Sequence, residues 1–119
     1  MKKTLHILAG LCFIVCIRQH SNAQISGGYT IGGDNPDFVD MSEAVNELIA
    51  QGGFGNVQFY VNPGTYTGQY SLVGLGENLN SLVIENMSGN PEDVVLTFDA
   101  STFDTNFILR VEDETNITI

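Results

Sequence analysis

The chain has 119 residues, and its 4 Lys and Arg stand against 14 Asp and Glu, so its formal net charge is -10. Three of the four cations, both histidines and both cysteines lie within the first 20 residues. The remainder has Arg110 as its one cation and has no His, Cys, Lys or Trp. This composition excludes Cys, His or Lys catalysis, a zinc site of Cys and His ligands, and a disulfide from that remainder. It also argues against nucleic-acid binding, which needs cations to meet the phosphates.

Residues 1–23 are typical of a secretory signal peptide. The stretch begins with the positive pair Lys2-Lys3 and continues with an apolar run over residues 7–17. Small residues in Ser21-Asn22-Ala23 then predict cleavage before Gln24.

Three other interpretations of this stretch stay open. A transmembrane anchor fits less well, because the apolar run is shorter than the ~20 residues of a membrane span. A buried core helix leaves the charged start and the cleavage pattern unexplained. A lipoprotein signal would modify Cys12 or Cys16, but the residue before each is large where a small one is expected. We therefore expect a secreted protein, extracellular or at the cell surface, whose mature part, residues 24–119, has no transmembrane segment.

One amphipathic helix is predicted near the start of the mature part. Apolar residues recur there at helical spacing, at Met41, Ala44, Val45, Leu48 and Ile49. Asp40 and Glu43 form a capping-box pattern at the start, and Gly52-Gly53 predicts the end. A helix this short is not stable alone, so its apolar stripe must pack on the rest of the chain.

Short strands separated by turn residues fill the rest of the mature part. Before the helix a strand is expected around residues 29–31; after it, strands are expected at 57–61, 65–72, 82–84, 94–98, 107–111 and 116–119. This spacing suits a sandwich, a barrel or a solenoid. Two features favour the solenoid: one helix stands first, where an exposed core and sheet edge need a cap, and the sequence stops within a strand pattern at Ile119.

The order of these segments resembles a known class of proteins. The segments are Tyr29-Thr30-Ile31-Gly32-Gly33, the helix, Gly55-Asn56-Val57-Gln58-Phe59, Pro63-Gly64-Thr65-Tyr66 and the run from Ser88 to Leu96. Together they resemble the N-terminal region of secreted right-handed parallel β-helix proteins of the Bacteroidetes type, which are related in fold to pectate lyases. The resemblance extends over about Tyr29 to Ile119.

The resemblance implies a mainly β fold that is the start of a right-handed parallel β-helix with one N-terminal capping α-helix. Residues 24–119 would be that cap and the first rungs, and we expect them to be the beginning of a longer protein. The expected function is a structural or adhesive segment of a cell-surface or extracellular protein, associated with polysaccharide and non-catalytic in itself. Its partners would be polysaccharide and the rest of the β-helix. The alternative is the N-terminal part of a polysaccharide lyase or glycoside hydrolase, and no catalytic residue is assigned to this chain.

Acidic residues supply the candidate metal ligands, although no cofactor is required by the sequence. Asp99 and Asp104 flank a polar loop and are candidate ligands for Ca²⁺, which takes about six to eight oxygens. Residues 34–37 and 112–114 are further candidates. For each of these the simpler interpretation is a solvated acidic turn. Paired carboxylates could also serve as the acid and base of a glycosidase, but no spacing selects a pair.

Arg110 and three tyrosines are the remaining candidates for contact with sugars. Arg110 could meet an acidic sugar, but strand alternation points it outward, where a salt bridge with Glu112 is the simpler interpretation. Tyr60, Tyr66 and Tyr70 could form a stacking platform for sugar rings, although strands favour aromatic residues in any case.

Overall fold

The computed structural model describes residues 23–99, 106–114 and 116–119, so all of the predicted signal peptide except Ala23 lies outside the described residues. The described chain is mainly β, with one α-helix and one short 3-10 helix. In chain order the elements are β1 (Ile25–Ile31), α2 (Met41–Gln51), β2 (Gly53–Val61), β3 (Gly64–Thr67), β4 (Tyr70–Leu72), β5 (Asn78–Asn86), η1 (Pro91–Asp93), β6 (Val94–Thr97), β7 (Leu109–Val111) and β8 (Ile117–Thr118).

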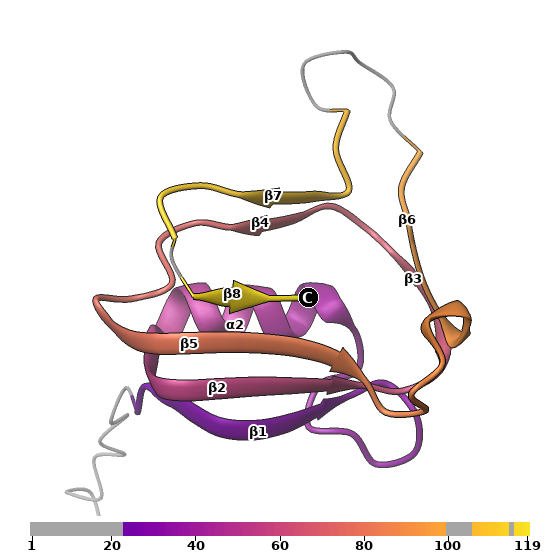
Figure 1. Ribbon diagram of the computed structural model, residues 1–119, viewed down its shortest axis with the longest axis horizontal. Coiled ribbons are helices and arrows are strands. Elements are labelled where there is room, and N and C mark those ends of the chain that lie inside the picture. Colours follow the sequence, from indigo (N-terminus) through magenta and orange to yellow (C-terminus); the bar gives the residue numbers. More distant parts are fainter. Residues whose placement is uncertain (1–22, 100–105, 115) are drawn as a thin grey trace, which may run out of the picture.

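The strands form three sheets, and every strand pair in the described residues is parallel. The first sheet has the order β1-β2-β5-β8, the second pairs β3 with β6, and the third pairs β4 with β7. From β2 to β4 the chain visits the three sheets in turn, and from β5 to β7 it visits them again in the same order (Figure 1). Each strand therefore lies beside its counterpart from the previous turn, as in the row Val57, Leu82 and Ile117. This all-parallel arrangement is not that of an antiparallel sandwich.

The first turn of the chain differs from the two that follow. Between β1 and β2 the chain forms α2 in place of strands for the second and third sheets, and α2 packs against β1 and β4 (Figure 1). The buried side chains of the helix are Met41, Ala44, Val45 and Leu48. Ile49, which we expected in the same stripe, lies at its edge and is 40% exposed. The helix thus covers one end of the strand stack.

Both ends of α2 are held as the sequence predicts. The Asp40 carboxylate accepts a hydrogen bond from the backbone N–H of Glu43 at 2.8 Å, and the Glu43 carboxylate accepts one from the N–H of Val39 at 2.7 Å. At the other end the N–H of Gly52 donates to the carbonyl of Leu48 at 2.9 Å. These bonds satisfy backbone groups that a helix terminus otherwise leaves unpaired.

The corner between β2 and β3 is fastened to the end of β1. The Asn62 side-chain amide donates to the carbonyl of Gly32 at 2.8 Å, and the Tyr66 hydroxyl donates to the carbonyl of Asn62 at 2.7 Å. Gly32 has φ +69°, and a Cβ there would lie 2.2 Å from the Tyr66 hydroxyl. This close approach explains why a glycine with left-handed backbone conformation ends β1.

The single strand expected over residues 65–72 is wrong, because two strands, β3 and β4, occupy this stretch. The chain turns from the second sheet to the third at Gly68, whose N–H donates to the carbonyl of Thr97 at 2.8 Å. A Cβ at Gly68 would lie 3.0 Å from the Ser42 hydroxyl on α2, so the corner approaches the helix closely. Other boundaries also shift: β1 and β2 begin four residues earlier than expected, and β5 runs from Asn78 to Asn86.

Candidate functional site

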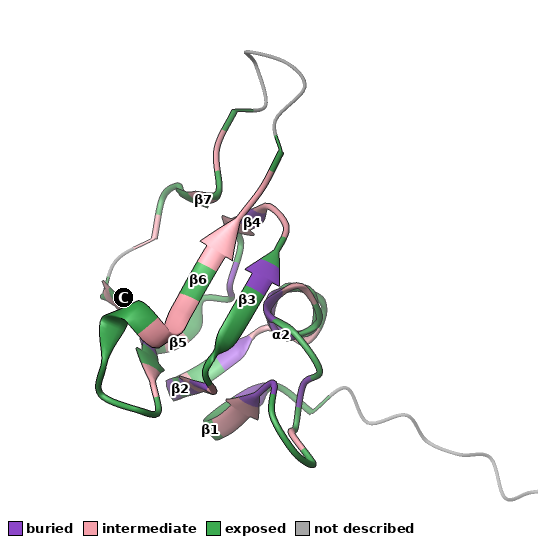
Figure 2. Cartoon of the chain, turned by 90° about the vertical axis from the view of Figure 1, so that its right-hand side faces the viewer, coloured by how far each residue is buried: buried purple, intermediate pink, exposed green. Residues whose placement is uncertain are grey.

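The two ends of the strand stack differ in how well their apolar side chains are covered. On the side of α2, Tyr70 and Leu72 of β4 are 1% and 0% exposed. Their register partners on β7 are less covered, because Leu109 is half-buried and Val111 is 42% exposed. β3 likewise contains a buried residue, Tyr66, whereas β6 contains none (Figure 2). We call the less covered side the open end and define it by the apolar residues Val94, Leu96, Leu109, Ile117 and Ile119.

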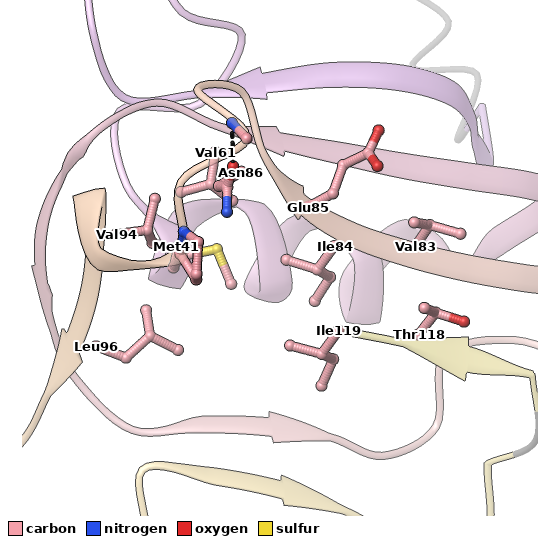
Figure 3. Close-up of a pocket in the computed structure, with 12 residues that line it drawn as sticks. Met41, Val61, Val83, Ile84, Glu85, Asn86, Val94, Leu96, Thr118 and Ile119 are labelled. Atoms are coloured by element: carbon pink, nitrogen blue, oxygen red, sulfur yellow. Dashed lines mark hydrogen bonds between the residues drawn. The ribbon is translucent and has the colours of Figure 1, made fainter.

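A cavity of about 560 Å³ lies at the open end. Met41, Ile84, Leu96 and Ile119 point toward this space from α2, β5, β6 and the residue after β8 (Figure 3). Glu85 is the one titratable side chain among the lining residues. An acid–base mechanism needs at least a suitably placed acid and base. The cavity is therefore suited to apolar packing and lacks the groups for such a mechanism within the described residues.

The predicted Ca²⁺ pair is only half within the described residues. Asp99 follows β6 and is exposed, whereas Asp104 lies outside the described residues. In the part of the chain that the structure describes, no three His, Cys, Asp or Glu side chains come close enough together to hold a metal ion.

Two residues of the other acidic candidate stretches, Asp37 and Glu114, accept hydrogen bonds from backbone N–H groups. The Asp37 carboxylate accepts hydrogen bonds from the backbone N–H and the hydroxyl of Thr30, at 2.8 and 3.1 Å. The Glu114 carboxylate accepts from the N–H of Leu75 at 3.0 Å. Asp37 therefore fixes the loop after β1 to that strand, and Glu114 fixes its loop to the preceding turn of the chain.

Arg110 forms the outward ion pair that the alternation of its strand predicts. Its Nη2 lies 2.5 Å from Oε1 of Glu112, and its Nε donates to the same oxygen at 2.7 Å. The guanidinium carbon also lies 5.9 Å from the centre of the Phe107 ring. Both charged side chains are about half exposed, at 47% and 48%, so the pair adds little stability. The ion pair neutralises Arg110, the one cation of the described residues, with the carboxylate of Glu112.

The three tyrosines do not form the candidate stacking platform, because two of them face the core. Tyr66 and Tyr70 are 8% and 1% exposed. Burial raises the pKa of the Tyr66 hydroxyl. Burial also raises the pKa of Tyr70, with a smaller upward contribution from the charge of Asp40 and an opposing one from its hydrogen bond with Ser42. Both residues are thus core residues, and Tyr60 alone of the three remains on a solvent face.

The solvent face of β2 carries a row of side chains that the sequence analysis did not identify. Along this strand Gly53, Val57, Phe59 and Val61 are buried, so the alternate residues point away from the core. We call these the β2 row: Phe54, Asn56, Gln58 and Tyr60. The predicted strand began at Val57, which left the first two outside it. The alternation of Phe54, Asn56 and Gln58 was the signal that could have revealed the row.

The comparisons with known proteins give no match, whether to protein-family models, to curated proteins or to solved structures. Within the described part of the chain, no helix has the length and apolar composition that a membrane crossing requires.

Proposed function

We propose that residues 24–119 are the N-terminal cap and first turns of a right-handed parallel β-helix, in a secreted structural or adhesive protein associated with polysaccharide. The repeated visit to three parallel sheets supports this fold. In a stack of this kind each turn covers the one before it, and the first turn needs a cap because it has no predecessor. The helix α2 fits that role, since it replaces two strands of the first turn.

The observation that carries the proposal is the loss of burial with distance from α2. Tyr66 on β3 is 8% exposed, whereas its register partner Leu96 on β6 is half-buried. Ile119 is 65% exposed. An apolar surface of this kind is expected where a further β turn packs. A cap without further turns would leave these side chains in contact with water.

A non-catalytic role is supported by the structural hydrogen bonds of four acidic residues. Asp37, Asp40, Glu43 and Glu114 hold loops or the helix start through hydrogen bonds to backbone N–H groups. Such positions stabilise the fold and do not present a pair of carboxylates across a cleft. Secretion rests on the signal-peptide pattern of residues 1–23, and a Ca²⁺ site at Asp99 and Asp104 remains part of the proposal.

Extending the chain tests the cap. Val83 pairs with Thr118, so the next residue, Ile119, lies beside Ile84. The residue after Ile119 would then lie beside Glu85. A second copy of residues 85–119 added after Ile119 would therefore continue the register. We expect Leu96→Ala to cost more unfolding free energy in this extended chain than in the 119-residue chain, because the added turn buries Leu96. Leu72→Ala is the control, since Leu72 is buried in both. Equal costs of Leu96→Ala in the two chains would count against the cap.

An activity assay tests the non-catalytic role. The purified chain is incubated with neutral and acidic polysaccharides, with and without Ca²⁺, and the reducing ends and unsaturated products are measured. We expect no cleavage. Cleavage that disappears in Asp99→Asn or Asp104→Asn would instead identify the chain as part of a polysaccharide lyase or glycoside hydrolase.

A further inference from the structure

We propose that the β2 row binds a neutral polysaccharide chain, with Phe54 and Tyr60 stacking on sugar rings and Asn56 and Gln58 hydrogen-bonding to hydroxyls between them. This inference rests on the proposed function and gives its polysaccharide partner a site and a chemical class.

The row has the dimensions of an extended ligand. Phe54 and Tyr60 are six residues apart on one strand, a separation of at most about 20 Å at ~3.3 Å per residue, because a register shift between Gly55 and Asn56 shortens the strand. β2 lies between β1 and β5, so the row runs along the sheet and not along its edge (Figure 1). A site this long and narrow fits several linked sugar units better than a single small molecule.

The tyrosine ring at one end of the row is held against the sheet. A Cβ on Gly28 would lie 2.9 Å from Cε2 of Tyr60, so the ring covers this glycine on the neighbouring strand. The Tyr60 hydroxyl donates a hydrogen bond to the side-chain oxygen of Gln58. These contacts fix the ring in place and present its other side to a ligand. At the far end Phe54 is 53% exposed, a large apolar surface for a residue inside a strand.

The amides between the rings suit hydroxyl groups. Oδ1 of Asn56 accepts a hydrogen bond from the Ser81 hydroxyl at 2.9 Å, which orients the side chain on the sheet. A carboxamide has two donor hydrogens and two acceptor lone pairs. Asn56 and Gln58 can therefore keep their hydrogen bonds within the protein and serve both donor and acceptor hydroxyls of a sugar.

The charge around the row selects a neutral ligand. Glu85 on β5 is the register partner of Tyr60 and is exposed. Arg110, the cation of the described residues, lies in the third sheet and is paired with Glu112. A polymer of acidic sugars would meet the Glu85 carboxylate without a compensating cation, which disfavours its binding.

Retention on insoluble polysaccharides tests the site with the full chain. We expect the protein to be retained by a neutral β-glucan or mannan and not by cross-linked polygalacturonate. Phe54→Ala and Tyr60→Ala should each weaken retention about fivefold or more, the loss expected for about 1 kcal/mol of stacking. Phe107→Ala, an aromatic truncation two residues before β7, is the matched control and should leave retention unchanged. An unchanged midpoint of thermal unfolding for Phe54→Ala would show that the variant is folded and that its weaker retention reflects weaker binding.

Several outcomes would overturn the inference. These are no retention on neutral polymers, equal retention of wild type and the two row variants, or preferential retention on polygalacturonate. Glu85→Gln tests the role of charge. It should raise retention on polygalacturonate and leave retention on the neutral polymer unchanged. If the extended chain buries Leu96 but no glycan is retained, this inference fails and the cap stands. If the chain cleaves the glycan, the non-catalytic role fails while the row remains a binding site.

Discussion

Gly32 shows how one residue fixes the joint between β1 and the following turn. Its φ of +69° is nearly that of Gly74 at +70°, but a Cβ at Gly74 would meet nothing within 4 Å, whereas one at Gly32 would lie 2.2 Å from the Tyr66 hydroxyl. We expect Gly74→Ala to cost about 1–2 kcal/mol through backbone strain alone. Gly32→Ala should cost about 1–3 kcal/mol more, because Tyr66 must move.

Urea unfolding of the two variants measures this difference. The two substitutions share the backbone penalty, so the excess in Gly32→Ala reports the close contact with Tyr66. In the background Tyr66→Phe, which removes the hydroxyl, the excess should shrink. An equal loss for both glycine variants would refute the role of this contact.

The buried tyrosines make the fold sensitive to alkaline pH. The pKa of Tyr66 and of Tyr70 is raised in the folded chain above the ordinary value of 10.0, chiefly by burial. The folded state therefore keeps its phenolic protons to a higher pH than the unfolded state. The associated stability is fully present below pH about 10 and is lost as the pH rises above it through the folded pKa values.

Urea midpoints measured between pH 8 and pH 11 check this expectation. The wild-type midpoint should fall steeply above pH 10, and Tyr66→Phe should fall less because one of the two groups is gone. Tyr66→Phe also loses the hydrogen bond to Asn62, so we expect about 0.5–1.5 kcal/mol lower stability at neutral pH. A midpoint that is flat to pH 11 in the wild type would contradict the argument.

At the scale of single elements, the sheets predict an unequal cost for the same substitution. Leu72 on β4 is fully buried, and Leu109 on the neighbouring β7 is half-buried. Leu72→Ala should cost about 2–5 kcal/mol, as buried leucine truncations do, and Leu109→Ala clearly less. Chemical denaturation of both variants tests this. Similar costs would mean that the open end is as well packed as the side of α2.

The elements that could be predicted from the sequence are those with local causes. The helix start depends on Asp40 and Glu43, three residues apart, and its end on Gly52, so the sequence predicts both. The Arg110 and Glu112 pair likewise follows from two residues on one strand face. In contrast, the burial of Tyr66 depends on the carbonyl of Ile31, to which its hydroxyl donates at 3.3 Å from 35 residues away. No local pattern carries that contact, so the sequence alone does not show that Tyr66 faces the core.

Phe54 and Asn56 of the β2 row fall outside the predicted strand for a different physical reason. Gly52, Gly53 and Gly55 resemble a turn in sequence, and glycine is normally unfavourable within a strand. In the structure Gly53 is buried, where a Cβ would lie 2.7 Å from the side chain of Leu79 and 3.3 Å from that of Leu48. Close packing of α2 and β5 thus requires glycine inside β2. This requirement is non-local, and it kept Phe54 outside the predicted strand.

At the scale of the whole molecule, an apolar open end and a strong negative charge oppose each other. Acidic residues near the open end include Glu85, Asp93 and Glu112, and Arg110 is the only cation of the described residues. Two copies that met through their open ends would bring these acids together. We expect this repulsion to keep the apolar surfaces apart at neutral pH. Near the isoelectric point of the sequence, about pH 4.1, the chain carries no net charge, so this repulsion is lost.

We therefore expect the purified chain to be monomeric at pH 7 and to associate reversibly as the pH falls toward 4. Sedimentation velocity at fixed salt measures the change, and far-UV circular dichroism establishes that the fold persists. Leu96→Lys should suppress association, because it places a charge in the surface that two copies would bury. Val39→Lys is the control, since Val39 is 72% exposed just before α2 and adds the same charge elsewhere. Equal suppression by both variants would show that net charge alone governs association, whereas suppression by Leu96→Lys alone locates the contact at the open end.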